Sequence, residues 1–391
     1  MRNRLLKGAE KMSISRFSFP TQIFLGAGVR SQVVEHLKSN GFKKPLYVTD
    51  RGVAKLGWYQ SLLSDAKSGS LEPASFSEIW GNPVKSQVMA GVEAFRSHRA
   101  DCVVGIGGGA ALDVAKAIIT MVNHPGDLFD YEDDLPGARP FDQAVPYWIA
   151  LPTTAGTGSE VGRSAVISDD KTHIKKIIFS PKLLAKAVFA DPELTFDLPA
   201  PITAATGLDA LTHNVEAYLA KNYHPLCDGI ALEGVRLAAE HLVNAVRSPK
   251  NIEARTGMLM SSMMGAIAFQ KGLGIVHSCA HALGTVVDMH HGLANGIMID
   301  HALKHNINVS KDRFITMARA IRLKDETPNG FIQWLGSLKS ELSIPAKLSG
   351  AGVKKESLAA LVEVATKDSC HMNNPVTVSA EDFKRIFAEA L

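Results

Sequence analysis

Residues 101–116 read DCVVGIGGGAALDVAK, and this stretch decides the fold of the N-terminal part of the chain. The apolar run over 102–106 is typical of a strand buried inside a parallel sheet. It leads directly into three glycines, Gly107 to Gly109, and then into a helical pattern. Glycines allow a close approach of the backbone, and the amino end of a helix presents free N–H groups and a positive dipole. The stretch therefore predicts a strand, a phosphate-binding turn and a helix.

The preceding residues repeat the same alternation of strand and helix. Residues 22–25 and 45–50 have strand character, and residues 31–39 between them have helical spacing. Such alternation predicts an α/β, doubly wound parallel sheet. The acid at the end of the second strand, Asp50, precedes the three glycines, so the usual G-x-G-x-x-G fingerprint is absent.

A second polar loop follows a later strand of the same sheet. Residues 152–160 read PTTAGTGSE, with four hydroxyl side chains and two glycines. Loops of this composition are often merely solvated. Because this one belongs to the same sheet as the glycine turn, we expect it to hydrogen-bond a phosphate or a ribose.

The character of the sequence changes near residue 200, where strand signals give way to long amphipathic runs such as 228–247 and 253–270. We therefore expect an α/β dinucleotide-binding domain over 12–193 and a helical, metal-binding domain over 194–391. Residues 1–11 are basic and lack the apolar core of a secretory signal, so we expect a disordered extension there. A ligand is expected in the cleft between the two domains.

Whole-chain properties exclude several classes of protein. The chain has 391 residues and a formal net charge of +3, which is too small to indicate a nucleic-acid or anionic-membrane partner. No apolar run approaches the ~18 residues of a membrane span. The four cysteines show no paired spacing of the metal or redox type, so a reducing cytoplasm is the expected location.

Histidines gather in the second half of the chain. Residues 272–284 read GLGIVHSCAHALG and are followed by HHG at 290–292, so four of the fourteen histidines fall within fifteen residues. His277 and His281 are four residues apart, as are Asp209 and His213, and each pair shares one face of a helix. One such pair alone would more often be ordinary core or surface residues. Two pairs and the nearby HHG indicate a site for Fe(II), Zn(II) or Mn(II) with open coordination positions.

Over nearly its whole length the chain resembles the iron-dependent (group III) alcohol dehydrogenases. The resemblance is carried by VTD at 48–50, GGGAALDVAK at 107–116, PTTAGTGSE at 152–160, GLDALTH at 207–213, GIVHSCAH at 274–281 and HG at 291–292. It implies a Rossmann-like domain and an all-helical domain, in a dehydroquinate synthase-like architecture. It also implies a homodimer or larger homo-oligomer.

The resemblance further implies roles for individual residues. The metal ligands would be Asp209, His213, His277 and His291. His281 would be an unligated catalytic histidine between the metal and the nicotinamide. The implied contacts to NAD are Asp50, Asn82, Gly108, Gly109, Asp113, Thr153, Thr154, Thr157 and Lys175. Asp50 would accept from the ribose 2′-hydroxyl and repel a 2′-phosphate, which favours NAD over NADP. For Asp113 a helix-capping role is an alternative. The chain departs from the family pattern at Ala110, where a serine is usual, and at Val376, where an arginine is usual.

The expected activity is NAD-dependent interconversion of a small primary alcohol, diol or hydroxyacid with its aldehyde or ketone, with iron as the expected metal. The alternatives on the same scaffold are a hydroxyacid-oxoacid transhydrogenase, a zinc-dependent polyol dehydrogenase and a lyase resembling dehydroquinate synthase. A lyase of that kind needs a cluster of cations for its substrate, and few are present near the expected site. Outside enzymes, the alternative is a protein that binds metal and nucleotide without turnover.

Overall fold

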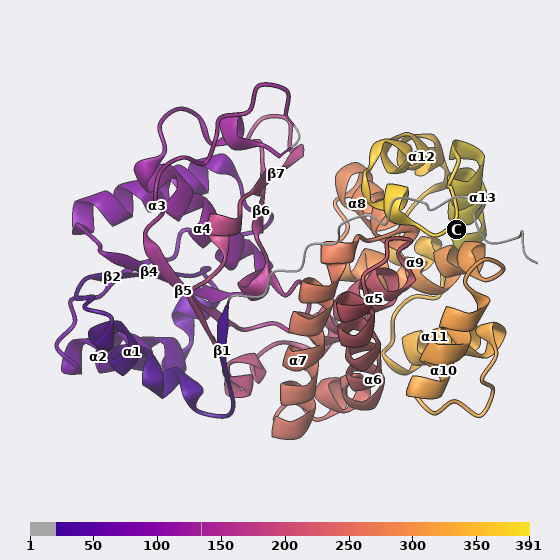
Figure 1. The fold of residues 1–391 in the computed structure, drawn as a ribbon, viewed down its shortest axis with the longest axis horizontal. Coiled ribbons are helices and arrows are strands. Elements are labelled where there is room, and N and C mark those ends of the chain that lie inside the picture. Colours follow the sequence, from indigo (N-terminus) through magenta and orange to yellow (C-terminus); the bar gives the residue numbers. More distant parts are fainter. Residues whose placement is uncertain (1–20, 134) are drawn as a thin grey trace, which may run out of the picture.

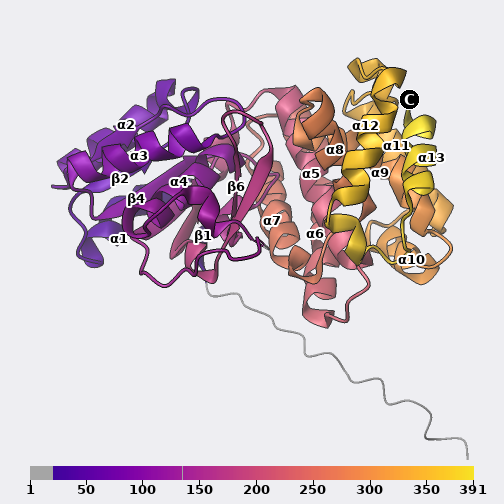
Figure 2. The ribbon, with the colours of Figure 1, turned by 90° about the horizontal axis from the view of Figure 1, so that it is seen from above.

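The computed structural model describes residues 21–133 and 135–391, so the extension expected over 1–11 lies outside the described residues. Figure 1 shows an α/β part on one side and a helical part on the other, and Figure 2 shows the same separation from above. The last strand of the α/β part ends at Ala190, and the first long helix of the second part begins at Ala200.

Within the described residues, six parallel strands form the main sheet in the order β1-β8-β5-β4-β2-β3. The strands are β1 Gln22–Leu25, β2 Pro45–Val48, β3 Ala74–Phe76, β4 Cys102–Gly107, β5 Tyr147–Pro152 and β8 Ala187–Ala190. Every residue of β2, β4 and β8 is buried, as expected for strands that are covered on both faces. The predicted doubly wound parallel sheet is confirmed.

Helices cover the two faces of this sheet (Figure 1). They are α1 Val33–Ser39, α2 Gly57–Ser68, α3 Lys85–His98 and α4 Gly109–Asn123. Side chains alternate along β2, so Tyr47 packs in the core with α1 and α2, whereas Leu46 and Val48 pack in the core with α3 and α4. Helix α4 starts directly after β4, and the strand–turn–helix expected over 101–116 is therefore present.

A small antiparallel pair, β6 Ser164–Ser168 and β7 Lys175–Phe179, was not expected from the sequence. Alternate residues of β7 face opposite ways: Ile178 is fully buried, whereas Ile177 and Phe179 are exposed. The pair follows the loop of residues 152–160 and lies on the side of the α/β part that faces the helices (Figure 1).

The second part is helical throughout the residues described. Its helices are α5 Ala200–Leu219, α6 Pro225–Arg247, α7 Ile252–Ala268, α8 Ile275–Val287, α9 His291–Leu303, α10 Lys311–Ala320, α11 Pro328–Glu341, α12 Leu358–Lys367 and α13 Ala380–Ala390. Helix α5 is the central one, with every residue from Thr203 to Leu219 buried. A helix surrounded on all sides has no solvent face, which explains how polar groups on α5 come to be buried.

No single helix of residues 21–133 and 135–391 has the length and apolar composition needed to cross a membrane. One pair of helical segments, Ile252–Lys271 and Ile275–Val287, meets that test only when the two are taken together, and it bends by 106°.

Candidate metal and dinucleotide site

Four side chains from three helices converge on one point. Asp209 and His213 lie one turn apart on α5, His277 lies on α8, and His291 begins α9. The Asp209 Oδ1 atom is 4.0, 3.8 and 3.4 Å from the Nε2 atoms of His213, His277 and His291, respectively. The four ligand atoms all lie within 4.8 Å of one another. Four atoms held tetrahedrally at a Zn–N or Zn–O bond length are roughly 3.4 Å apart, so the set fits a divalent ion with modest contraction.

The environment of three of these side chains, Asp209, His213 and His291, favours the protonation states that bind a metal. Burial opposes ionisation of Asp209, but the three neighbouring imidazoles outweigh it, and the pKa of this carboxyl lies below its usual value. Burial lowers the pKa of His213 to about 4 and holds that of His291 well below its ordinary value. Neutral imidazoles and one carboxylate are the protonation states that a metal requires.

Glu216, which lies three residues after His213 on α5, holds His277 in place. Its Oε2 accepts from His277 Nδ1 at 2.7 Å, and its two oxygens also accept from the backbone N–H groups of Gly274, Val276 and His277 at 2.6–3.2 Å. The same carboxylate therefore caps the amino end of α8 and turns His277 Nε2 toward Asp209. Burial would lower the pKa of His277, but the bond to Glu216 raises it above its usual value.

Asn295 of α9 reaches the same point. Its Nδ2 donates to Asp209 Oδ1 at 2.7 Å, and its Oδ1 is buried without a partner among the described residues. An amide in direct contact with the carboxylate orients the Asp209 side chain. Sequence reasoning missed Asn295, because one helical turn beyond His291 is not by itself a signal.

His281 takes no part in the four-residue set. Its ring stacks on that of His291, with centroids 5.3 Å apart, and its Nδ1 lies 2.7 Å from Asp368 Oδ2. Asp368 also accepts from Ser278 Oγ at 2.7 Å. Burial opposes ionisation of Asp368, yet the bond with His281 holds the pKa of Asp368 far below its usual value. Asp368 could not be found from the sequence, since 87 residues separate it from His281.

On the α/β side, the glycine turn lies against the polar loop. A Cβ atom on Gly108 would be 3.1 Å from Thr154 Cγ2, and one on Gly109 would be 2.8 Å from Thr157 Cγ2. A larger residue at either position would force the threonine side chain to shift, so glycine suits this close approach. The structure thus brings together the turn and the loop that were singled out separately in the sequence, and Thr153 N bonds to Gly107 O at 3.0 Å.

Asp50 lies beside this turn, because β2 and β4 are neighbours in the sheet. Its Oδ1 accepts from the N–H groups of Gly52 and Val53 at 2.7 and 2.9 Å. The other oxygen is 3.3 Å from the position that a Cβ on Gly107 would occupy. A carboxylate is therefore held at the carboxyl edge of the sheet, where dinucleotides bind in open α/β folds.

The remaining predicted residues lie apart from the turn. Asn82 Nδ2 donates to Asp288 Oδ1 at 3.1 Å, so it joins the α/β part to the end of α8. The ammonium of Lys175 lies 3.5 Å from the position that a Cβ on Gly284 of α8 would occupy, and burial lowers its pKa. Asp113 accepts from Ser159 Oγ at 2.6 Å and from Val166 N at 3.0 Å. Asp113 does not cap α4, because that helix begins four residues earlier, at Gly109. The contact of Asp113 with a cofactor stays a prediction.

Glu160 in the polar loop is a buried acid whose Oε1 has no partner among the described residues. Burial raises its pKa to about 7.

The raised pKa of Glu160 makes the stability of the protein depend on pH. Between the pKa of the unfolded state and about pH 7, the folded protein keeps the Glu160 proton and the unfolded protein loses it, so the free energy of unfolding falls as the pH rises through this range. We expect Glu160→Gln to remove this loss, which amounts to roughly 3 kcal/mol. The melting temperature of the variant relative to wild type should therefore rise between pH 5 and pH 8. The surface variant Glu78→Gln serves as the control, and parallel curves for all three proteins would contradict the assignment.

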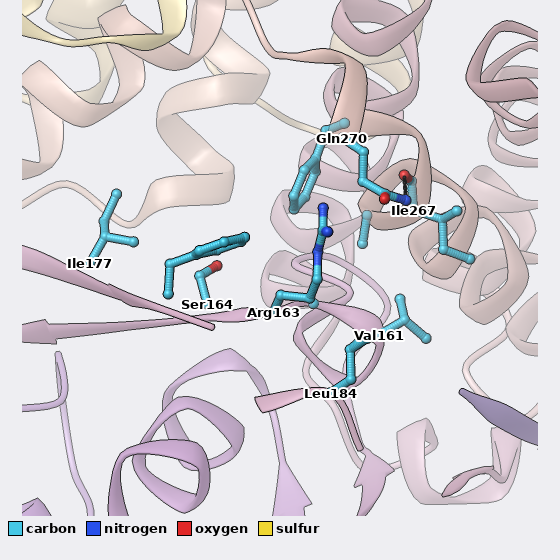
Figure 3. A pocket seen from close by; sticks show the side chains of 11 residues that line it. Val161, Arg163, Ser164, Ile177, Leu184, Ile267 and Gln270 are labelled. Atoms are coloured by element: carbon cyan, nitrogen blue, oxygen red, sulfur yellow. Dashed lines mark hydrogen bonds between the residues drawn. The ribbon is translucent and has the colours of Figure 1, made fainter. Parts of the chain in front are cut away.

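A pocket of about 250 Å³ lies between β6, β7 and α7 (Figure 3). It is lined by Val161, Gly162, Arg163, Ser164, Ile177, Phe179, Leu184, Ala266, Ile267, Phe269 and Gln270. The Phe269 ring also packs on His213, with centroids 5.3 Å apart. The pocket and the four-residue set therefore share Phe269 as a common wall.

Comparison with known proteins agrees with this geometry. The family model described as iron-containing alcohol dehydrogenase matches residues 20–192, and that of the C-terminal part of the Fe-containing alcohol dehydrogenase family matches residues 203–391. The chain is 38% identical to 4-hydroxybutyrate dehydrogenase of Cupriavidus necator over 95% of this chain and 98% of that protein.

Two solved structures extend the comparison. A crystal structure of 1,3-propanediol oxidoreductase is 34% identical, with a TM-score of 0.90 over 96% of this chain and 100% of that one. Sulfoacetaldehyde reductase from Bifidobacterium kashiwanohense, solved in complex with NAD+, is 28% identical, with a TM-score of 0.88 over 97% and 99% of the two chains. The chain belongs to the iron-containing alcohol dehydrogenase family.

Proposed function

We propose that this member of the family, an alcohol dehydrogenase, interconverts a small primary alcohol, diol or hydroxyacid with its aldehyde or ketone, using NAD and one divalent metal, with Fe2+ as the expected ion. The observation that carries the proposal is the convergence of Asp209, His213, His277 and His291 within 4.8 Å. The related proteins named above act on a hydroxyacid, a diol and a sulfonated aldehyde, and one was solved with NAD+.

In this proposal Asp209, His213, His277 and His291 hold the metal. When bound, the metal supplies Lewis acidity toward the substrate oxygen, and the nicotinamide supplies the hydride acceptor. Glu216 and Asn295 keep His277 and Asp209 in the ligating orientation.

His281 moves the proton. With Asp368 accepting from Nδ1, the other ring nitrogen, Nε2, is left as the atom that receives a proton from the hydroxyl and passes it toward solvent. Asp368 is a positioning residue, because it fixes the tautomer and the plane of the ring.

The dinucleotide is assigned to the α/β domain, residues 12–193, and the metal to the helical domain, residues 194–391. The N–H groups at Gly108 and Gly109 face the diphosphate. The other assigned contacts are Asp50, Asn82, Asp113, Thr153, Thr154, Thr157 and Lys175. We assign the protein to the cytoplasm as a homodimer or larger homo-oligomer; its four cysteines are all free thiols, which suits a reducing compartment.

The test is NADH formation followed by absorbance. Apo-protein is reconstituted with Fe(II), with Zn(II) or with no metal, and a panel of alcohols, diols and hydroxyacids is supplied, with the aldehydes for the reverse direction. We expect turnover only with metal, because the substrate hydroxyl ionises too weakly without a Lewis acid. Binding of NAD and metal without turnover in either direction would contradict the dehydrogenase assignment.

Asp50 sets the expected choice of cofactor. Replacing it by glycine removes a negative charge that repels a 2′-phosphate, and it also removes an acceptor for the 2′-hydroxyl. We expect the ratio of kcat/KM for NAD to that for NADP to fall by roughly 100-fold. Asp65→Gly, on the surface of α2, is the matched control. An unchanged ratio in Asp50→Gly would place the adenosine ribose elsewhere.

A further inference from the structure

The pocket of Figure 3 contains a cation that the proposed chemistry does not use. Arg163 is the only charged side chain among the described residues that line it, and no acid is among them. Its guanidinium extends from the start of β6 toward Gln270 on the opposite side (Figure 3). We propose that Arg163 binds an anionic group at the far end of the substrate, so that the enzyme prefers hydroxyacids and their aldehyde forms over neutral diols. This inference rests on the proposed function, whose substrate class it narrows.

The guanidinium is free to accept such a ligand. Within residues 21–133 and 135–391 the structure gives it neither a hydrogen bond nor an ion pair, although the chain has many of both. Its one recorded partner is the ring of Phe179, whose centroid lies 5.3 Å from Cζ. The five donors of this half-buried arginine are therefore available to a ligand, and a planar carboxylate fits its fork in a bidentate manner.

The described lining holds no acid that could compete with an anionic ligand for Arg163. The amide of Gln270 donates from Nε2 to Ile267 O at 2.8 Å, so only its carbonyl oxygen is left as an acceptor, whereas Ser164 supplies a hydroxyl that can donate to an anion. The rest of the lining is largely apolar, with Val161, Leu184 and Ile267 suited to methylene groups. An apolar lining with a few polar groups is typical of a site that orients a short chain.

The pocket lies next to the proposed metal site. Phe269 lines it and packs on His213, so the cation and the proposed metal site lie on either side of one aromatic ring. A volume of about 250 Å³ is below the roughly 300–1,000 Å³ of sites for drug-sized ligands, and it suits a molecule of a few carbons.

The anionic group takes no part in the electron balance. The carbinol C–H bond breaks and its electron pair moves as hydride to the NAD of the proposed function, while the hydroxyl proton leaves by way of His281. Arg163 therefore determines which substrate is preferred, because it binds the anionic group of a hydroxyacid and a neutral diol has no such group.

The experiment compares 4-hydroxybutanoate with 1,4-butanediol, which have equal chain length and differ at the end remote from the reacting hydroxyl. The proteins are wild type, Arg163→Met, Arg163→Lys and the exposed-cation control Lys43→Met. In Arg163→Met we expect kcat/KM for the acid to fall roughly 10- to 100-fold, as for the loss of a hydrogen bond to a charged group, with the diol nearly unchanged. Arg163→Lys should recover part of the loss, and Lys43→Met should equal wild type.

Equal losses for acid and diol in Arg163→Met, or no loss for the acid, would overturn the inference while leaving the dehydrogenase intact. A second readout is independent of turnover: calorimetric titration of 4-hydroxybutanoate into wild type and Arg163→Met in the presence of NAD and Zn(II). Binding that is weakened in the variant supports the anion site even if neither substrate turns over, which would defeat only the proposed function. Equal binding to both proteins contradicts the site.

Discussion

Replacing His291 by alanine should abolish the activity almost completely and release the metal. Of the three imidazole nitrogens that face Asp209 Oδ1, His291 Nε2 is the nearest, at 3.4 Å. His291 is the first residue of α9, whereas the other three proposed ligands lie within helices. Loss of one of four ligands weakens the hold on the ion, and the ion's Lewis acidity is worth several kcal/mol in the transition state. We expect kcat/KM to fall by roughly 10³-fold or more, and bound metal per chain, measured by mass spectrometry after dialysis, to fall with it.

The adjacent residue provides a matched control. His290 carries the same side chain one position earlier, but it lies outside the four-residue set and its Nδ1 accepts from Leu293 N at 3.4 Å at the start of α9. His290→Ala should therefore cost at most about 1 kcal/mol of stability, as for loss of a helix cap, and should retain the metal. If the two alanine variants bind metal equally well, the assignment of His291 as a ligand is wrong.

Glu216→Gln should lower stability and metal affinity together. The carboxylate is buried and accepts from three backbone N–H groups and from His277 Nδ1. In the glutamine variant an NH2 group replaces one carboxylate oxygen and faces at least one of these N–H groups, which leaves that N–H without an acceptor. The variant also lacks the negative charge that strengthens the remaining hydrogen bonds. We expect a loss of about 2–4 kcal/mol in unfolding free energy, as for breaking a buried charged network. Metal affinity should fall roughly 10- to 100-fold, as for loss of a ligand's orienting partner.

Two measurements separate these effects. Thermal unfolding in the presence of a chelator reports stability without the metal, and competition with a chromophoric chelator reports affinity. The control is Glu233→Gln on α6, whose ion pair with Arg236 is at the surface and is worth little. Stability and affinity both equal to wild type in Glu216→Gln would show that this carboxylate neither caps α8 nor orients His277.

Two pairs of residues with the same spacing of four show what spacing alone can predict. Asp209 and His213, four residues apart on α5, do meet at one point, as their shared helical face predicted. His277 and His281 have the same spacing, yet His277 faces Asp209 whereas Nδ1 of His281 faces Asp368. The family resemblance predicted a ligand role for His277 and an unligated role for His281. The spacing could not distinguish these roles, because a shared helical face does not reveal what packs against each residue.

The sequence by itself determined the parallel sheet, the glycine turn before α4, the helical second half and the residue types of the four-residue set. These features follow from local patterns: apolar runs, glycines at a strand end, and residues that repeat at helical spacing. Only the tertiary structure decided the partners of the site, namely Glu216 for His277, Asp368 for His281, Asn295 for Asp209 and the pocket around Arg163. These contacts join residues far apart in the chain, so they depend on how whole helices and strands pack, and no local period encodes that packing.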